Sequence, residues 1–151
     1  MPYSIKVEGD KYAKAFGRNL PLSLKDSVNL CRALKGMKLD DAKDFLEDVI
    51  KKKRAVPYFR YLDSISHRHG IGPGRYPVKE AKHILKVLEN AEANAENKDL
   101  DTDSLYIMHI AAHKGRVFKT YTPRAYGRAT EIRRDRVNIE VILEERVPEE
   151  E

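Results

Sequence analysis

The sequence predicts an α+β protein of a single domain that extends a long β-hairpin. Apolar residues have the spacing of amphipathic helices in three stretches, 24–35, 39–52 and 77–97. Apolar and polar residues alternate in period two over 137–144, which indicates a half-buried strand. A chain of 151 residues is large enough to bury one hydrophobic core but too short to form two cores of adequate size, so we expect one domain over 1–151.

A first strand is expected at 16–22, with Pro21 favouring an edge position because proline cannot donate to a strand ladder. Its apolar side is predicted to hold Phe16, Leu20 and Leu22. The hydroxyl of Ser23 can then cap the first helix, and Gly36 can end it. The inward side of this helix is predicted to hold Leu24, Val28, Cys31 and Leu34.

The second and third helices follow from the same spacing. The second is predicted to face inward through Leu39, Ala42, Leu46, Val49 and Ile50. Pro77 is well placed to open the third helix, because its missing N–H needs no partner there. The third is predicted to face inward through Ala81, Ile84, Leu85, Leu88, Ala91 and Ala95. The only cysteine, Cys31, excludes an intramolecular disulfide and is expected to be a buried apolar thiol.

Two strands form the predicted hairpin, with a first arm at 105–121 and a second at 130–146. Each arm would be about 50 Å long at about 3.3 Å per residue, which is longer than the body could cover. Residues 116–136 offer almost no apolar face. An isolated two-stranded ribbon is marginal in water, so another molecule is expected to hold it.

Charge is strongly segregated along the chain. The net charge is +5, but residues 51–82 carry nine Lys/Arg against two acidic residues, a net +7. Residues 114–136 carry eight against two, a net +6, which leaves −8 for the remainder. Arginine and tyrosine are interleaved in both basic windows, which favours nucleic acid over a merely solvated surface.

The segment 53–76 is predicted to be an ordered but irregular basic loop, since it is rich in Gly, Pro, Tyr and Arg. A metal-dependent nuclease site formed by Asp63, His67 and His69 is the catalytic alternative, but no helix presents these residues on one face. The glycines match no phosphate-binding loop. A loop on a phosphate backbone accounts for the composition better.

No catalytic set, metal site or cofactor site stands out elsewhere, so we expect a protein that is not an enzyme. No run of about 18 apolar residues is present, and the first ten residues lack an apolar signal core. We therefore expect no membrane partner and a cytoplasmic location.

Three motifs carry a resemblance to a known family. They are L-P-L-S-L-K (20–25), V-L-E-N-A-E-A-N-A-E-N-K-D-L-D-T-D-S-L-Y-I (87–107) and T-P-R-A-Y-G-R-A-T-E-I-R-R (122–134). The chain is similar to the universal large-subunit ribosomal protein L twenty-two family in its archaeal and eukaryotic form. It departs from the family at Leu24, where proline is common, and at Tyr126, where the bacterial members have arginine. Segment 53–76 has no bacterial counterpart and resembles the insertion of the archaeal and eukaryotic branch.

The resemblance implies three helices packed on a small three-stranded antiparallel sheet, with a long protruding β-hairpin. It divides the chain into a body (1–113 and 137–151), a hairpin tip (114–136) and the basic insertion (53–76). It implies that the body binds large-subunit rRNA near the exit and that the tip lines the nascent-peptide tunnel. The tunnel-lining residues would be Thr122, Pro123, Arg124, Ala125, Tyr126, Gly127, Arg128, Ala129 and Thr130.

The expected RNA contacts combine both lines of reasoning. On the hairpin they are the basic residues Lys114, Arg116, Lys119, Arg124, Arg128, Arg133, Arg134 and Arg136, with Tyr121 and Tyr126 stacking on bases. On the body they are Arg18, Lys25, Lys52, Lys53, Arg54, Arg60, Arg68 and Arg75. Expected partners are large-subunit rRNA, neighbouring large-subunit ribosomal proteins and the nascent polypeptide. A free nucleic-acid-binding regulator is the alternative function.

Overall fold

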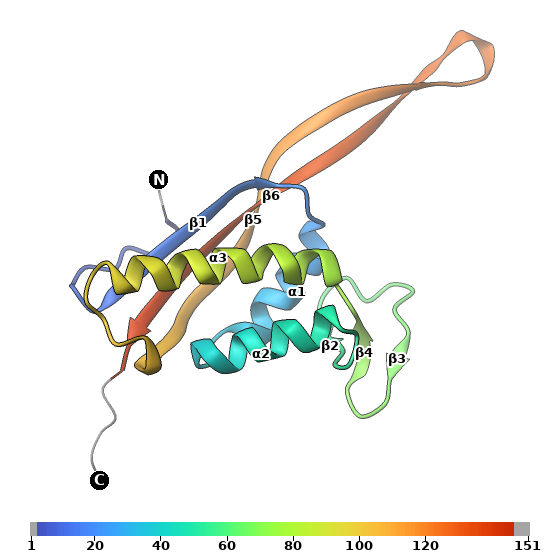
Figure 1. Cartoon of the computed structure of the whole chain (residues 1–151). Coiled ribbons are helices and arrows are strands. Elements are labelled where there is room, and N and C mark those ends of the chain that lie inside the picture. The colour runs from blue at the N-terminus through green and yellow to red at the C-terminus, as the bar shows by residue number, and fades with distance from the viewer. Residues whose placement is uncertain (1–2, 147–151) are drawn as a thin grey trace.

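The computed structural model describes residues 3–146. The main elements in that part of the chain are β1 (Tyr12–Leu20), α1 (Leu24–Leu34), α2 (Leu39–Ile50), α3 (Val78–Glu96), β5 (Leu105–Pro123) and β6 (Ala129–Glu145). The three strands form an antiparallel sheet in the order β1-β6-β5, and the helices lie over one face of it (Figure 1). This confirms the predicted α+β fold of three helices on a three-stranded sheet with a protruding hairpin.

The helix boundaries follow the predicted signals. Ser23 Oγ accepts a hydrogen bond from the Asp26 N–H at 3.5 Å and so caps α1. Gly36 follows the helix with φ of 84°, a left-handed conformation that glycine adopts without strain. Lys38 provides no side-chain cap for α2. The negative charges of Asp40 and Asp41 in the first turn stabilise the helix instead, because they lie at the positive end of its dipole.

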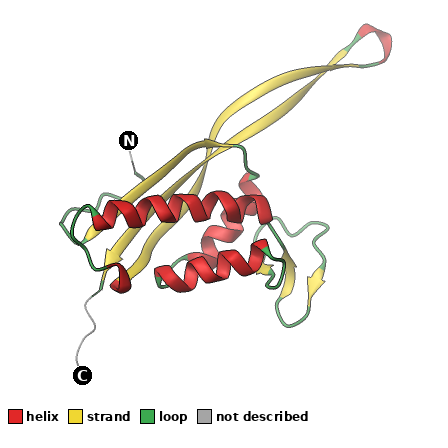
Figure 2. Ribbon diagram, in the orientation of Figure 1, coloured by secondary structure: helices red, strands yellow, loops and turns green. Residues whose placement is uncertain are grey.

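The core lies between the sheet and the helices. β6 contributes the four fully buried residues that the alternation predicted: Val137, Ile139, Val141 and Leu143. α3 packs on β1 and β6, α1 packs on β5, and α2 packs on α3 (Figure 2). Cys31 is buried as expected, and burial raises the pKa of its thiol to about 12, which makes it unreactive.

The inward sides of the helices were predicted only in part. In α1, Leu30 is fully buried whereas Val28 is half-buried. The reason is that α1 packs on β5 and also contacts the segment after α2, so its buried side is broader than a single stripe. In α2, Phe45 is also buried, and Ile50, like Leu85 of α3, is only half-buried.

The prediction for the first strand was wrong in its limits and its buried side. β1 begins at Tyr12, and its buried residues are Ala13 and Ala15. Its pairing with β6 shifts in register between Gly17 and Leu20, which breaks the alternation that the prediction assumed. α3 approaches β1 closely there, since a Cβ on Gly17 would lie 2.9 Å from Cγ2 of Val87. The edge position of the strand is confirmed.

The segment 53–76 is more regular than predicted. It contains β2 (Val56–Pro57), β3 (His67–Arg68) and β4 (Gly72–Arg75), which form a small antiparallel sheet in the order β2-β4-β3. Glycine and proline within these strands argue against strand structure in a sequence. The backbone pairing of these three strands outweighs the low strand propensity of their glycine and proline residues.

The hairpin leaves the body where β1 ends. The last pair between β1 and β6 is Leu20 with Val137, whereas β5 and β6 stay paired as far as Pro123 and Ala129 (Figure 2). A tight turn at Ala125–Gly127 closes the hairpin, and a short 3-10 helix at Thr102–Ser104 precedes it. Within residues 3–146, no helix is long and apolar enough to cross a membrane.

Candidate nucleic-acid interface

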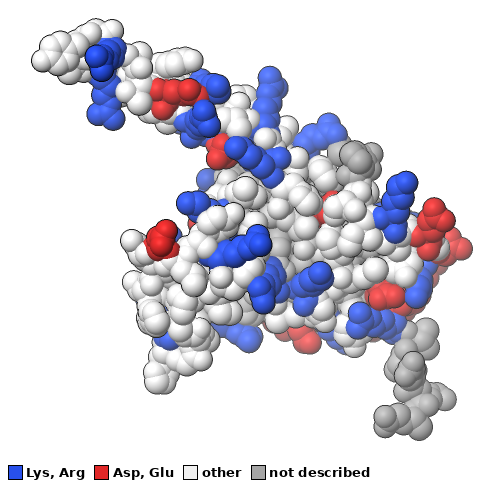
Figure 3. Space-filling view, turned by 180° about the vertical axis from the view of Figure 1, so that it is seen from behind, with Lys and Arg blue, Asp and Glu red and all other residues white. Residues whose placement is uncertain are grey.

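The part of the hairpin that extends beyond β1 exposes nearly all of its predicted RNA-contact residues. The basic residues and tyrosines chosen from the sequence are exposed, apart from Arg136, which is half-buried. Tyr121 is 68% exposed and Tyr126 is 97% exposed, so neither ring packs into the protein. Lys and Arg follow the hairpin and continue over the body, and several acidic groups lie at the end of the body far from the hairpin (Figure 3).

The two faces of the hairpin differ in charge. Phe118 pairs with Arg134 on one face, whereas Lys119 pairs with Arg133 on the other. On the second face, Glu131 forms ion pairs with Lys119 at 3.3 Å and with Arg133 at 3.2 Å. Those ion pairs lower the pKa of Glu131, Lys119 contributing most. The Phe118 face is therefore the one with the greater unbalanced positive charge.

Phe118 organises that face. The guanidinium carbons of Arg116 and Arg136 lie 5.4 and 5.3 Å from the centroid of its ring. Both distances are in the range of cation–π attraction. The ring is 43% exposed and so contributes little to any core. The sequence reasoning missed Phe118, although two arginines flanking a lone aromatic residue across a hairpin could have indicated it.

The tip has a defined backbone. The Arg124 N–H donates to the Arg128 carbonyl at 2.7 Å, which closes the turn. Tyr126 has φ of 60° and Gly127 has φ of 65°, so two successive residues take the left-handed conformation. The tunnel-lining candidates Thr122 to Thr130 surround this turn, and all except the half-buried Thr122 are exposed.

Three predicted body residues meet at one groove. A cavity of about 510 Å³ between the end of α2 and the basic insertion is lined by Lys53, Arg54 and Arg68 together with aromatic residues. The Arg54 guanidinium carbon lies 4.7 Å from the ring centroid of Phe45, and that of Arg68 lies 5.1 Å from the ring centroid of Tyr76. A groove with stacked, exposed arginines suits a phosphate backbone.

The other predicted body residues are spread over the surface. Lys25 and Arg75 line a separate hollow, where the Lys25 ammonium lies 5.3 Å from the ring centroid of Tyr61. Arg60 lines another, together with Arg32. The remaining two lie outside these three cavities: Arg18 on β1 and Lys52 after α2.

Arg32 was missed from the sequence. It is exposed on α1, and its guanidinium carbon lies 4.0 Å from the ring centroid of Phe59. Lys35 lines the same hollow one turn further along. Their spacing of three residues on a helix could have indicated a shared basic face.

α1 holds the basic insertion in place. Asn29 is buried, and its Oδ1 accepts hydrogen bonds from the N–H groups of Phe59 and Arg60 at 3.0 and 3.2 Å. The Tyr58 hydroxyl donates to Asp26 Oδ1 at 2.6 Å. Burial, and then this hydrogen bond, raise the pKa of Tyr58 well above its ordinary value. The insertion is therefore anchored to the body through side chains and not only through its ends.

The residues of the nuclease alternative do not assemble. Asp63 lies in a turn before β3, His67 is on β3 and His69 is in the turn that follows. Among residues 3–146, no group of three or more His, Cys, Asp or Glu side chains is arranged to hold a metal ion. The structure gives the metal-dependent nuclease hypothesis no support.

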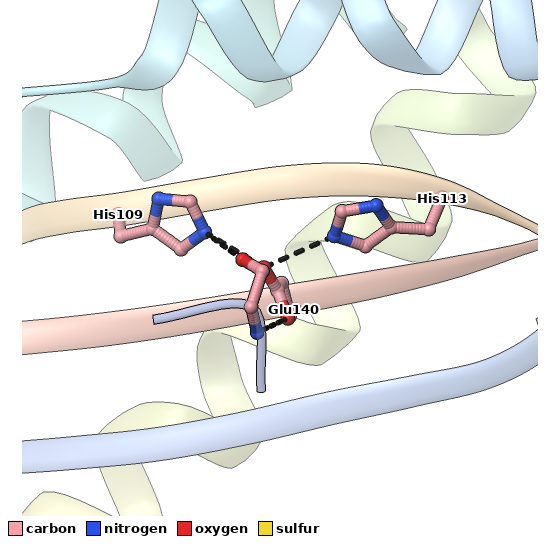
Figure 4. A network of polar contacts seen from close by, with 4 residues as sticks. His109, His113 and Glu140 are labelled. Carbon is pink, nitrogen blue, oxygen red and sulfur yellow. Dashed lines mark hydrogen bonds and ion pairs between the residues drawn. The ribbon is translucent and has the colours of Figure 1, made fainter. Parts of the chain in front are cut away.

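A polar cluster on the main sheet was not foreseen. Glu140 of β6 is 1% exposed, and its Oε1 is 2.7 Å from His109 Nε2 and 3.0 Å from His113 Nε2 (Figure 4). Ser4 donates to the same carboxylate from its hydroxyl and, at 3.0 Å, from its N–H. Burial opposes ionisation, but the hydrogen bonds from Ser4, His113 and His109 outweigh it and lower the pKa of Glu140 to about 2.

The alternation of apolar and polar residues over 137–144 predicts that Glu140 is on the side of the strand away from the core. The signal that could have corrected this is the spacing of His109 and His113, which lie on the same side of one strand opposite a glutamate on its partner. The N-terminal segment that covers the carboxylate is 136 residues away in sequence from Glu140, so no local pattern reports it.

A helix-covered sheet that extends a basic hairpin with no core of its own has the features of a ribosomal protein that reaches out from a folded body. The family model described as "Ribosomal protein L22p/L17e" matches residues 15–144, and the chain belongs to that family. The resemblance found in the motifs is thereby confirmed.

Curated relatives agree over nearly the full chain. The chain is 57% identical over 143 residues to "Large ribosomal subunit protein uL22" of Thermoplasma acidophilum, covering 95% of this chain and 94% of that protein. It is 53% identical over 151 residues to the protein of the same name from Methanopyrus kandleri, covering 95% of each. These names describe a ribosomal protein, which confirms the expectation that the chain is not an enzyme.

Proposed function

We propose that this protein is a structural constituent of the large ribosomal subunit, where it binds rRNA and supports folding and assembly of the subunit. Its partners are large-subunit rRNA and neighbouring ribosomal proteins, and its location is on the ribosome. The observation that carries the proposal is the long hairpin, whose exposed arginines have no apolar core beneath them. RNA phosphates supply the counter-surface that such a ribbon lacks in water.

The hairpin tip is proposed to line the nascent-peptide exit tunnel and to meet the nascent polypeptide. Support comes from its length and its closed turn. β5 continues from Lys114, which pairs with the last β6 residue that β1 reaches, to Pro123, a span of about 30 Å at about 3.3 Å per residue. The tip therefore lies far from the body, and residues Thr122 to Thr130 are free of tertiary packing except along the ribbon itself.

Sedimentation separates this function from a free nucleic-acid-binding regulator. The tagged protein should travel with the large subunit through a high-salt wash, because many phosphate contacts and the threaded hairpin hold it. Release of most of the protein into the soluble fraction, at salt that leaves other subunit proteins bound, would favour the regulator.

Salt dependence of binding tests the charge contacts on the body. Binding of the isolated protein to an rRNA transcript should weaken linearly in log affinity against log salt. Arg60→Ala combined with Arg68→Ala should make the slope shallower by about 0.7–0.9 per lost phosphate contact. The matched control is Lys11→Ala with Lys98→Ala, two exposed basic residues near the other end of the body. An equal change of slope in both pairs would contradict a specific role for the basic insertion.

A further inference from the structure

We propose that the open face of the main sheet, at the root of the hairpin, holds one unstacked nucleotide of the bound RNA. The proposal rests on the RNA-binding function above and adds a defined pocket for a single base. A cavity of about 440 Å³ is present there. That volume lies within the range of about 300–1,000 Å³ in which proteins hold small ligands.

The pocket is on the side of the sheet that the helices leave open. Asn138 and Glu140 alternate along β6 with Ile139 and Val141, which are buried beneath the helices. On this open side, Phe16 of β1 pairs with Glu140, and His113 of β5 pairs with Asn138. An aromatic ring and two hydrogen-bonding side chains therefore occupy adjacent rows of the same surface.

Two aromatic rings form one wall of the pocket. The ring centroids of Tyr3 and Phe16 are 5.9 Å apart and their planes meet at 86°. Neither ring is fully buried. Such a corner offers a base one ring face for stacking and one ring edge for contact, as in recognition of unstacked RNA bases. Lys14 adds positive charge beside it, with Nζ 5.6 Å from the Tyr3 centroid.

The polar groups of the pocket are held in fixed orientations. Asn138 Oδ1 accepts a hydrogen bond from the Asn19 N–H at 2.8 Å, which turns the amide Nδ2 into the available donor. His113 Nε2 is bound to Glu140, so its second ring nitrogen lies on the other side of the ring from the carboxylate (Figure 4). These groups suit the hydrogen-bonding edge of a base. Arg18 also lines the pocket, and a guanidinium suits the phosphate of the same nucleotide.

The negative charge of Glu140 is offset by hydrogen-bond donors and by positive charge nearby. One of its oxygens is engaged by His109, His113 and Ser4, and the other by the Ser4 N–H. Arg18 and Lys14 stand on the neighbouring strand. The pocket therefore combines an aromatic corner, fixed donors and positive charge at its rim, which is the chemistry of a nucleotide site and not of an apolar peptide site.

Nuclear magnetic resonance of the isotope-labelled protein with each of the four nucleoside 5′-monophosphates tests the pocket. At least one nucleotide should shift the Asn138 side-chain amide and the backbone signals of Phe16 and His113 in a saturable way, whereas inorganic phosphate should not. Phe16→Leu should abolish these shifts. In a second arm, Phe16→Leu should weaken binding to a large-subunit rRNA transcript roughly 5- to 150-fold, the range for loss of one stacked base, without changing the salt slope.

Tyr12→Leu is the matched control, because Tyr12 lies on the same strand and the same side but outside the pocket. Thermal unfolding of both variants shows whether the fold is retained. Absence of either expected effect, or an equal effect of Tyr12→Leu, overturns the pocket. Failure of the wild-type protein to bind rRNA at all would instead overturn the proposed function, whereas wild-type rRNA binding that Phe16→Leu leaves unchanged would overturn the pocket alone.

Discussion

At the scale of single residues, Glu140 shows how one buried charge links distant parts of the chain. Its carboxylate accepts hydrogen bonds from both histidines of β5 and from Ser4, so it ties the N-terminal segment to the hairpin strands. A buried charge is costly unless it is fully hydrogen-bonded. Here the partners outweigh burial, because the pKa of the group is lowered to about 2.

Glu140→Gln should therefore destabilise the protein in a pH-dependent way. At pH 7 the expected loss is about 1.5–3 kcal/mol in the free energy of unfolding, the range for hydrogen bonds to a charged group. The pKa is lower in the folded state than its ordinary value of 4.5, so this stability is present above pH 4.5 and is lost as pH falls toward 2. Urea unfolding at pH 7 and pH 3 measures the difference.

The gap between wild type and Glu140→Gln should thus be clearly smaller at pH 3 than at pH 7. Glu89→Gln, at an exposed position of α3, is the control and should change little at either pH. A gap that stays constant over this range would show that the carboxylate does not gain its stability through ionisation.

At the scale of elements, the hairpin is ordered by its own cross-strand contacts where no third strand supports it. Phe118 holds two arginines, one from each strand, on the face with the greater unbalanced charge. Arginines that are ordered before binding lose less side-chain freedom when they meet phosphates. Phe118 is on this view a positioning residue for Arg116 and Arg136.

Phe118→Leu should weaken binding to an rRNA transcript by about 0.5–1 kcal/mol, the value of an exposed cation–π contact. Phe118→Tyr keeps the ring and should restore wild-type affinity. Because neither change alters a charge, the slope of log affinity against log salt should stay the same. Filter binding at several salt concentrations measures both quantities. Equal loss in the Leu and Tyr variants would contradict the positioning role.

At the scale of the whole molecule, the proposed functions of docking and tunnel lining are assigned to separate parts of the chain. The core lies between the helices and the part of the sheet that β1 reaches, and the tip contributes no residue to it. Removing the tip should therefore leave the body folded and change only what the tip does. The strand register identifies the residues that can be removed, because Tyr121 and Glu131 are directly paired across the hairpin.

Replacing residues 122–130 by Asn-Gly joins this pair with a turn that suits a two-residue hairpin. The shortened protein should unfold at nearly the wild-type temperature and still enter large subunits. The tunnel near the missing tip should widen, and stalling by arrest peptides should change. Reconstituted subunits and a translation-arrest assay measure this.

A flexible Gly/Ser tip of the original length is the control that separates loss of tip contacts from loss of length. Normal occupancy with unchanged stalling in the shortened variant would refute the tunnel-lining role. Failure of the shortened protein to fold would show instead that the tip supports the body.

The sequence by itself determined the α+β class, the three helices, both hairpin arms and the segregation of positive charge. These properties depend on neighbours within a few positions, such as the Ser23 cap and the alternation from Val137 to Leu143, so periodicity reports them. It also supplied the exposed basic residues, because charged side chains remain at the surface almost wherever the chain places them.

Only the tertiary structure decided the start of β1, the burial of Glu140, the stacking around Phe118 and the groove shared by Arg54 and Arg68. Each of these depends on segments distant in sequence or on a shift of strand register. A bulge of one residue turns side chains to the other face of a sheet, and no pattern along one strand reports its partner's register. Ser4 meets Glu140 only because three strands and an N-terminal segment converge there, and that convergence is a property of the packed chain.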